Sequence, residues 1–451
     1  MKMPINENLI DLSRQLTAPL YVVGGYVRNF LIDGTVSTDV DLCSNVERQE
    51  LVFALEKTGF KIVAEYPRTR TILFTDENQK YEFTAMRVDG YTGGEHKPII
   101  TVFTDDIVED ARRRDFKCNA IYYDVKSEKI IDPLNGLEDI KNKVLDTVKN
   151  PDQVFCNDGL RLMRLARFTG ELGFTPTREV MISAKKYADN ILEIAKERVT
   201  EELKRILISD TKYSFSDKQG HYKALKVLDE TRVLDRIIPE LTLGRGMEQR
   251  KDYHKYDVLE HSLKAVQYAD KDIRIPALFH DIAKPKQYVE NGNFYKHDKV
   301  GAELVKEVLS KLKFDKKTIK ETEFLTRYHM LDMDLKLRNS KLRKFIVENY
   351  LRINKLFKLK QADYSASYDD LGVCPTIIKW QNEIEKIETE NVPLSIKDLD
   401  ITAKDITGLG FSDNQIGEVL SFIFNQAVIN PKMNKRDKLL DMVYKYRYKK
   451  R

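Results

Sequence analysis

The chain has 451 residues, of which 42% are hydrophobic and 33% are charged, a balance typical of a globular protein with a polar surface. This length exceeds what one ordinary hydrophobic core supports, so we expect several domains. No apolar run approaches the roughly 20 residues of a membrane span, the N-terminal stretch lacks a basic-then-apolar signal, and the four cysteines have no paired spacing. These features argue against a membrane protein, a disulfide framework and a zinc ribbon, and they predict a cytoplasmic protein.

Short strand-like runs alternate with helical segments up to about residue 146. We predict strands at residues 21–25, 39–44, 70–75, 81–87, 119–125 and 128–133. From Asp158 onward, apolar residues recur with the 3.6-residue period of helices, and β-branched runs are few. The predicted fold class is therefore α+β, with a mixed β-sheet head followed by a long all-α body.

Two carboxylates stand one residue apart in the second predicted strand, at Asp39 and Asp41. Because side chains on a strand alternate faces, both project from the same side. Like charges this close repel each other unless a cation neutralises them. Glu82, in a neighbouring predicted strand, is a candidate third acid, and carboxylate oxygens suit Mg²⁺, which bridges to substrate phosphates. A surface strand or a turn is the alternative for so short a motif.

A pair of glycines, Gly24 and Gly25, separates the first predicted strand from a predicted helix. Glycines let backbone N–H groups approach an anion closely, and the start of the helix adds positive charge. Arg28, one turn into the helix, can reach the same phosphates. A glycine pair alone could be only a tight turn, but the carboxylate pair that follows favours a phosphate site.

The segments GGYVRNFLIDG and TDVDL together resemble the head of the class II tRNA nucleotidyltransferases, which comprise the CCA-adding enzymes and their bacterial poly(A) polymerase relatives. Further blocks follow in that family's order, namely AMRVDGYTGGEHKP, RRDFKCNAIYYD, DPLNGLEDI, NDGLRLMRLARF and ERVTEELKRIL. The resemblance implies a nucleotidyltransferase-type head that adds CCA, from CTP and ATP, to the 3′ end of tRNA and releases pyrophosphate. It also implies that Asp39 and Asp41 are catalytic and hold the metal ions that activate the RNA 3′-hydroxyl.

Other activities remain open on the sequence alone. An enzyme that adds only A or only CC, or a poly(A) polymerase, would share most of these blocks. Asn157 stands where the family usually has glutamate, and this departure bears on base selectivity. A metal phosphohydrolase with an RNA-binding head and a non-catalytic RNA-binding module are more distant alternatives, against which the adjacent carboxylates argue.

The resemblance also implies nucleotide-binding positions in the head and in the first helices of the body. Asp158 and Arg161 lie three residues apart, so a helix places them on one face, where they can match the Watson–Crick edges of C and A. Arg113 and Arg114 are cations for the triphosphate, and Asp115 is available to orient one of them. The full set is Gly24, Gly25, Arg28, Arg87, Arg113, Arg114, Asp115, Asn119, Asp158, Arg161, Arg164, Arg167 and Arg198.

Two of these positions carry further expectations. Arg87 and the loop 89–98 are expected to move between C addition and A addition. Arg198, with Glu197 and Glu202, is expected to buttress the template helix or to stack near the base; a purely structural role is the alternative.

Five of the seven histidines fall between residues 254 and 329, on predicted helices or at their ends. Their order, with the adjacent pair His280 and Asp281, resembles the HD phosphohydrolase superfamily. The implied ligands of one metal are His261, His280, Asp281 and Asp363, and a second metal would add His297 and His329. Imidazole with carboxylate suits Ni²⁺, Mn²⁺ or Zn²⁺, with Mg²⁺ as a further candidate. Taken singly, each histidine could instead be a core or capping residue.

The C-terminal stretch from Asn434 holds eight Lys or Arg and two Asp, a net charge of +6. Basic residues interleaved with tyrosines suit a nucleic-acid backbone, whereas a frayed solubilising tail is the alternative. The candidate tRNA contacts are Lys435, Arg436, Lys445, Arg447, Lys449 and Lys450.

The predicted organisation has four parts. They are a catalytic head (1–146), a helical neck with the base template (147–245), an HD-type domain (246–375) and a C-terminal tRNA-binding segment (376–451). The expected partners are the 3′ end of tRNA, CTP and ATP, with no membrane. Monomer and homodimer both remain open.

Overall fold

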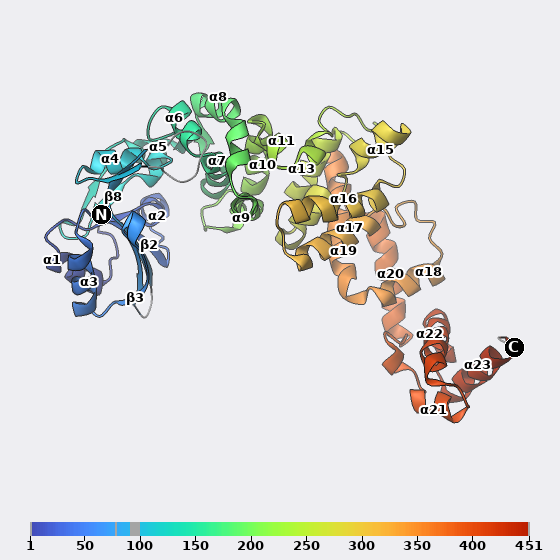
Figure 1. Cartoon of the computed structure of the whole chain (residues 1–451). Coiled ribbons are helices and arrows are strands. Elements are labelled where there is room, and N and C mark those ends of the chain that lie inside the picture. Colours follow the sequence, from blue (N-terminus) through green and yellow to red (C-terminus); the bar gives the residue numbers. More distant parts are fainter. Residues whose placement is uncertain (1, 77–78, 91–99, 450–451) are drawn as a thin grey trace. The chain divides into compact units, whose positions relative to one another are not determined.

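The computed structural model describes residues 2–76, 79–90 and 100–449 (Figure 1). The chain divides into two compact units, described separately below. The first extends to Thr242 and includes Val308–Asp315, and the second comprises Leu243–Glu307 and the chain from Lys316 onward. Among the described helices, none is both long and apolar enough to cross a bilayer.

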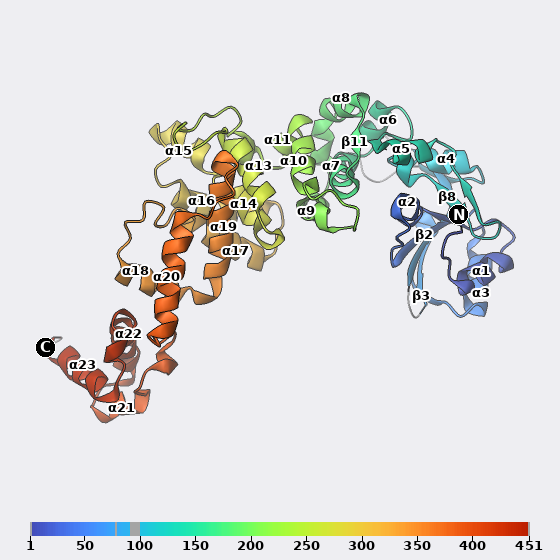
Figure 2. The ribbon, with the colours of Figure 1, turned by 180° about the vertical axis from the view of Figure 1, so that it is seen from behind.

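A seven-stranded mixed sheet, in the order β3-β4-β5-β2-β1-β8-β9, forms the centre of the first unit. Strand β2 lies antiparallel to β1 and parallel to β5. One face of the sheet packs on α1 (Glu7–Gln15) and α3 (Arg48–Lys57), which lie beside it in Figures 1 and 2. The strands are β1 Tyr21–Val23, β2 Asp39–Cys43, β3 Lys61–Tyr66, β4 Thr71–Thr75, β5 Lys80–Thr84, β8 Tyr122–Asp124 and β9 Lys129–Ile131.

The six predicted strands are all present, but the sequence pattern missed others. Strand β3 was not predicted because it is an edge strand whose residues are half-buried or exposed, so its apolar signal is weak. The run 81–87 divides into β5 and the start of β6 (Arg87–Gly90), which pairs with β7 (Ile100–Phe103) outside the main sheet. A short pair, β10 (Val144–Leu145) and β11 (Thr175–Pro176), was also missed.

Helix α7 (Leu160–Leu172) is buried along nearly its whole length and packs against α6 (Pro151–Asn157), α9 (Lys196–Leu207) and α10 (Gly220–Glu230) of the first unit. Helix α10 crosses it so closely that a Cβ on Gly220 would lie 2.2 Å from the carbonyl oxygen of Gly170. The others are α2 Gly25–Asp33, α4 Ile107–Arg112, α5 Gly136–Asn142, α8 Arg178–Lys186, α11 Val233–Ile237 and α12 Pro239–Thr242.

The second unit is helical, as the apolar period predicted. Helix α13 (Val258–Tyr268) packs along α19 (Tyr350–Tyr368), and the C-terminal helices enclose a separate apolar cluster around Ile406, Ile423 and Leu439. The other helices are α14 Arg274–Phe279, α15 Lys284–Asn291, α16 His297–Lys311, α17 Lys316–Tyr328, α18 Asn339–Glu348, α20 Pro375–Thr389, α21 Ala403–Gly408, α22 Asp413–Ile429 and α23 Arg436–Lys449.

Candidate functional site

The head presents three carboxylates on adjacent strands. In β2, Val40 and Leu42 are buried in the core, whereas Asp39 and Asp41 face the opposite side and reach solvent. Asp41 lies directly beside Glu82 of β5 in the parallel register. The alternation expected of a strand therefore brings these three acids together on one face of the sheet.

Electrostatics at this face favour a bound cation. Desolvation by the surrounding protein and the charge of Asp39 raise the pKa of Asp41, against the opposing pull of Arg114, Arg164 and Arg28. The pKa of Glu82 is raised as well, by desolvation and by Asp41. In the described part of the chain, the three acids do not form a group whose ligand atoms all lie within 4.8 Å. The fit to a divalent ion therefore rests on donor chemistry and strand register.

Gly24 connects this face to the glycine turn. Its φ of 78° lies in the left-handed region, and a Cβ there would lie 2.9 Å from Oδ2 of Asp41. Helix α2 begins at the next residue, so the turn, the helix start and Asp41 meet at one point. Only glycine fits both the backbone conformation and the close approach.

We expect Gly24→Ala to lower kcat/KM for the nucleotide incorporation that the family resemblance implies at least about tenfold, because the methyl group displaces the Asp41 carboxylate. It should also lower the free energy of unfolding by about 1–2 kcal/mol. Gly34→Ala is the matched control, since Gly34 has a φ of 81° but nothing within 4 Å of its Cβ position. Steady-state kinetics and denaturant unfolding of both variants check this. Equal losses of activity would contradict the Asp41 contact.

Arg28 is buried beneath the glycine turn and is held from several sides. It donates to Asn119 Oδ1 at 2.5 Å and to Asn29 Oδ1 at 2.8 Å, and its Nη2 lies 3.2 Å from the Tyr213 hydroxyl. Its guanidinium also lies 5.2 Å from the ring centre of Phe168. This network fixes Arg28 close to the turn, and two of its partners, Tyr213 and Phe168, had no sequence signal pointing to this site.

Asp110, which the sequence reasoning did not single out, orients the two arginines of the RRDF block. It accepts from Arg113 Nε at 2.6 Å and from Arg114 Nη2 at 3.1 Å. Burial alone would raise the pKa of Asp110, but Arg114 and Arg113 outweigh it and hold the pKa at about 2. The expectation that Asp115 orients one of these arginines is wrong, because Asp115 points elsewhere.

Asp115 instead pairs with helix α7, at whose start the predicted base-template residues lie. It accepts from Arg164 Nε of α7 at 2.6 Å and from Asn119 Nδ2 at 3.2 Å. Since Asn119 also holds Arg28, the RRDF block, α2 and α7 are joined by one buried network. Burial opposes ionisation of Asp115, yet Arg164 and Arg161 hold its pKa at about 2.

This lowered pKa makes the stability of the first unit depend on pH. Because the folded-state pKa of Asp115, about 2, lies below the ordinary value of 3.8, its charge stabilises the fold above about pH 4. The contribution, about 2 kcal/mol, is lost as the pH falls from about 4 to about 2. Asp115→Asn should therefore lower the free energy of unfolding by about 2 kcal/mol at pH 6 and by much less near pH 2. Denaturant titrations measure this difference, and a pH-independent difference would refute the charge effect.

Asp158 and Arg161 lie at the start of α7, and both are buried. Asp158 accepts from the Leu160 amide at 2.9 Å, and its Oδ2 lies 3.8 Å from Arg161 Nε. Arg161 also donates to the backbone carbonyl of Arg113 at 2.6 Å, which links this pair to the RRDF block. The two residues therefore form a buried ion pair, since neither residue is more than 6% exposed.

The other candidate positions of the neck and hairpin are placed as follows. Glu202 of α9, which was expected to act with Arg198, pairs with Arg167 of α7 at 2.9 Å. Arg198 is half-buried in the first turn of α9. Arg87 pairs with Asp89 at 2.8 Å at the base of the β6–β7 hairpin. Most of the loop expected to move, residues 91–98, lies outside the described residues.

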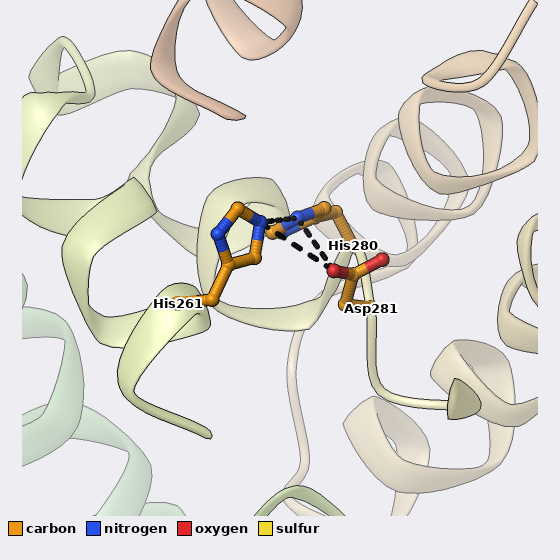
Figure 3. A group of neighbouring side chains, drawn as sticks. All are labelled: His261, His280 and Asp281. Carbon is orange, nitrogen blue, oxygen red and sulfur yellow. Dashed lines mark hydrogen bonds and ion pairs between the residues drawn. The ribbon is translucent and has the colours of Figure 1, made fainter. Parts of the chain in front are cut away.

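The second unit contains a buried cluster of histidines and aspartates. Nε2 of His261 and Nε2 of His280 are 3.3 Å apart, and both face Oδ2 of Asp281, at 3.5 and 3.2 Å (Figure 3). Asp363 of α19 completes this side, with Oδ1 lying 2.9 Å from His261 Nε2. The donor atoms of His261, His280 and Asp281 lie close enough to share one ion.

A second group uses the other oxygen of Asp281. His297 Nε2 lies 3.1 Å and His329 Nε2 lies 3.5 Å from Oδ1. His280, His297 and His329 each place Nδ1 2.7–2.8 Å from a backbone carbonyl three residues earlier. An Nδ1–H bonded in this way directs the Nε2 lone pair toward a metal, which is the usual support of a histidine ligand. The residues therefore fit two ions bridged by Asp281.

Three further residues near this cluster were missed by the sequence reasoning. Lys284 Nζ lies 2.6 Å from Asp281 Oδ2 and donates to Gln249 Oε1 at 2.7 Å. The ring of His254 lies 4.8 Å from that of His261. Burial alone would raise the pKa of Asp281, but His280 and Lys284 hold it well below its usual range. The HDIAK spacing, with Lys284 one turn after Asp281, was the available signal for the lysine.

The C-terminal candidates differ in what the structure describes. Lys435 and Lys445 are exposed, whereas Arg436 forms an ion pair with Asp405 of α21. The side chains of Arg447 and Lys449 are not described, and Lys450 lies outside the described residues.

Three family models match successive parts of the chain. Residues 20–146 match the poly A polymerase head domain, residues 173–243 match a probable RNA and SrmB-binding site of polymerase A, and residues 252–361 match the HD domain. Together the three models cover more than half of the chain.

Relatives carry corresponding names. An A-adding tRNA nucleotidyltransferase of Deinococcus radiodurans is 29% identical over 352 residues, which is 73% of this chain and 77% of that protein. A CCA-adding enzyme of Geobacillus kaustophilus is 33% identical over 210 residues, which is 46% of this chain and 50% of that protein. The alignment to such CCA-adding relatives thus spans about half of their length.

Solved structures share the fold along nearly the whole chain. The Bacillus stearothermophilus CCA-adding enzyme in complex with CTP has a TM-score of 0.65 at 20% identity and covers 98% of both chains. The Thermotoga maritima CCA-adding enzyme complexed with tRNA has a TM-score of 0.60 at 17% identity, covering 97% of this chain and 94% of that one. The matched domains, their order and this fold place the chain in the tRNA nucleotidyltransferase and poly(A) polymerase family, as a member with an HD domain.

Proposed function

We propose that the chain adds C, C and A to the 3′ end of tRNA from CTP and ATP, releasing pyrophosphate. The observation that carries this proposal is the meeting of Asp39, Asp41 and Glu82 with the Gly24 turn, in the same unit as the buried Asp158–Arg161 pair. Relatives named as CCA-adding enzymes support it, as do solved structures of such enzymes with CTP, ATP and tRNA.

Different residues of the chain bind the triphosphate and the base of the nucleotide. Arg113 and Arg114 neutralise the triphosphate, with Arg28 beneath the glycine turn. The pair Asp158 and Arg161 selects the base through the donor and acceptor pattern of its Watson–Crick edge. Because both residues are buried and tied to neighbouring backbone, they are held in place before the nucleotide binds.

The acids Asp39 and Asp41, with Glu82 as a third candidate ligand, would hold Mg²⁺. The chemistry that such ions supply is charge neutralisation of the triphosphate and activation of the RNA 3′-hydroxyl. The exposed Lys435 and Lys445 would contact the tRNA backbone by charge, because A-form RNA hides its sequence-bearing major groove.

The test uses the purified protein with Mg²⁺ and three tRNAs, which end before CCA, at C and at CC. Labelled CTP and ATP are supplied separately and together. Incorporation of two C and then one A is the expected result, and it would show that Asn157 is compatible with CCA addition. Addition of A alone, or of a long A tract, would overturn the proposal. Addition of A alone would match the name of the Deinococcus relative, an A-adding enzyme.

We further propose a metal-dependent phosphohydrolase activity on terminal phosphates for the second unit. The observation that favours it is the pair of three-ligand groups that share Asp281. The donor set of imidazole and carboxylate fits Ni²⁺, Mn²⁺ or Zn²⁺, with Mg²⁺ as a further candidate. Release of phosphate from 3′-phosphorylated oligonucleotides, assayed with each ion in turn, tests this activity. No turnover with any of the four ions would overturn it.

A further inference from the structure

Asp110 of α4 is a carboxylate of the head with hydrogen-bond donors at both oxygens. It is 0% exposed, and both of its oxygens accept from two donors. Oδ1 accepts from Arg113 Nε at 2.6 Å and from the Arg87 amide at 3.2 Å. Oδ2 accepts from the Tyr122 hydroxyl at 2.8 Å and from Arg114 Nη2 at 3.1 Å. One buried side chain thus joins α4, the β6 hairpin, β8 and the RRDF block.

We infer that Asp110 is a positioning residue for nucleotidyl transfer. It directs the side chains of Arg113 and Arg114 toward the nucleotide. Through Arg113, it also supports the template residue Arg161. This inference rests on the proposed function, since it assigns Asp110 a part in that reaction. Asp110 does not itself contact the nucleotide in this role.

The geometry around the two arginines supports a positioning role. Arg113 and Arg114 follow Asp110 by three and four residues, so one carboxylate meets both guanidinium groups. The two side chains are only 14% and 16% exposed, so neither is free to turn in solvent. Their charges reach the catalytic face, because Arg114 is the strongest of the cations acting on Asp41. Without Asp110, two adjacent cations would repel each other and lose their fixed orientation.

A second contact extends the effect to the base. The carbonyl of Arg113, whose side chain Asp110 holds, accepts from Arg161 Nη2 at 2.6 Å. Arg161 in turn lies 3.8 Å from Asp158. The triphosphate end and the base end of the nucleotide site are therefore joined through Arg113. Loss of Asp110 should therefore weaken the binding of both CTP and ATP.

The experiment measures nucleotide incorporation by full-length Asp110→Asn on tRNA lacking CCA and on tRNA ending in CC. We expect KM for both nucleotides to rise at least about tenfold and kcat/KM to fall about 100-fold, while tRNA affinity stays within about twofold. Glu109→Gln is the matched control, because Glu109 is the neighbouring acid of α4 and its partner Arg112 is exposed. This control should behave like the wild type.

Tyr122→Phe tests the same carboxylate with a smaller change. It removes the hydroxyl that donates to Asp110 and accepts from Arg114 Nε at 3.1 Å, and it leaves the contact between Arg113 and Asp110 intact. We expect KM to rise about threefold to fivefold, an effect between those of Glu109→Gln and Asp110→Asn. This variant keeps the inference falsifiable if Asp110→Asn does not fold.

The outcomes separate the inference from the proposed function. A wild-type protein that incorporates no nucleotide would refute the proposed function itself. Normal KM values for Asp110→Asn, or for Tyr122→Phe where Asp110→Asn does not fold, would overturn the inference while leaving that function intact. Parallel losses of tRNA affinity, kcat and thermal stability without a selective rise in KM would show a merely structural carboxylate. The double variant Asp110→Asn with Arg161→Lys should lose less kcat/KM than the product of the two single-variant losses, because both residues act through the shared contact with Arg113.

Discussion

Asp41→Ala will abolish nucleotide incorporation, with a loss of at least about 1,000-fold in kcat, while tRNA affinity remains within about twofold. Asp41 lies beside Glu82 in the sheet and against the Gly24 turn, so its removal leaves Asp39 as the only other acid of β2 on this face. The remaining carboxylates would then neither balance the arginines nor hold a cation for the triphosphate. Single-turnover incorporation of CTP and filter binding of tRNA measure the two quantities separately.

Glu65→Gln is a suitable control for that result. Glu65 lies on β3, at the far edge of the same sheet, where it pairs with Arg48, and its change should leave incorporation unaltered. If Asp41→Ala lost tRNA binding and thermal stability in parallel with activity, the acid would be structural. Since its side chain reaches solvent and lies outside the core, we expect a melting temperature close to that of the wild type.

Asp281→Ala is expected to have the second-largest effect, on the other unit. It removes a carboxylate that belongs to both histidine groups, so the binding of both ions should be lost. We expect the phosphohydrolase rate to fall at least about 100-fold and the number of tightly bound Mn²⁺ ions to fall to zero. Nucleotide incorporation should be unchanged. Electron paramagnetic resonance counts bound Mn²⁺ independently of activity.

Asp334→Asn is the control for this prediction. Asp334 is an exposed acid of the same unit, paired with Lys336, and its change should alter neither metal binding nor turnover. His297→Ala should remove one of the two ions, because His297 belongs to the group that faces Oδ1 of Asp281. Retention of both ions in Asp281→Ala would mean that the histidines bind metal without the shared carboxylate, contrary to the two-group arrangement.

Local patterns predicted those features of the site that depend on residues close together in the chain. The alternation of side chains along β2 is enough to place Asp39 and Asp41 on one face, because period 2 is a property of any strand. The glycine turn and the following helix are likewise local, and both are present as expected. Half-exposed edge strands lack such a pattern, which is why β3 was missed.

Partners distant in the chain could not be predicted in this way. The wrong expectation for Asp115 arose because the nearest arginines in sequence, Arg113 and Arg114, were taken as its partners. In the fold, Arg164 reaches Asp115 across 49 residues, while Asp110 takes the two arginines. Gln249 and Lys284 similarly meet across 35 residues beside the metal cluster. Charge alone does not specify which of several acids an arginine meets.

The sequence by itself determined the family resemblance, the α+β class, the carboxylate pair and the order of histidines, because these reside in residue identity and short-range spacing. Only the tertiary structure decided that Arg28 is buried and held by Asn119, that Asp110 orients two arginines, and that Asp281 offers one oxygen to each histidine group. The physical reason is that burial and hydrogen-bond partnership depend on packing between distant segments. A buried charge must find a partner wherever the fold brings one, and spacing along the chain does not encode which one.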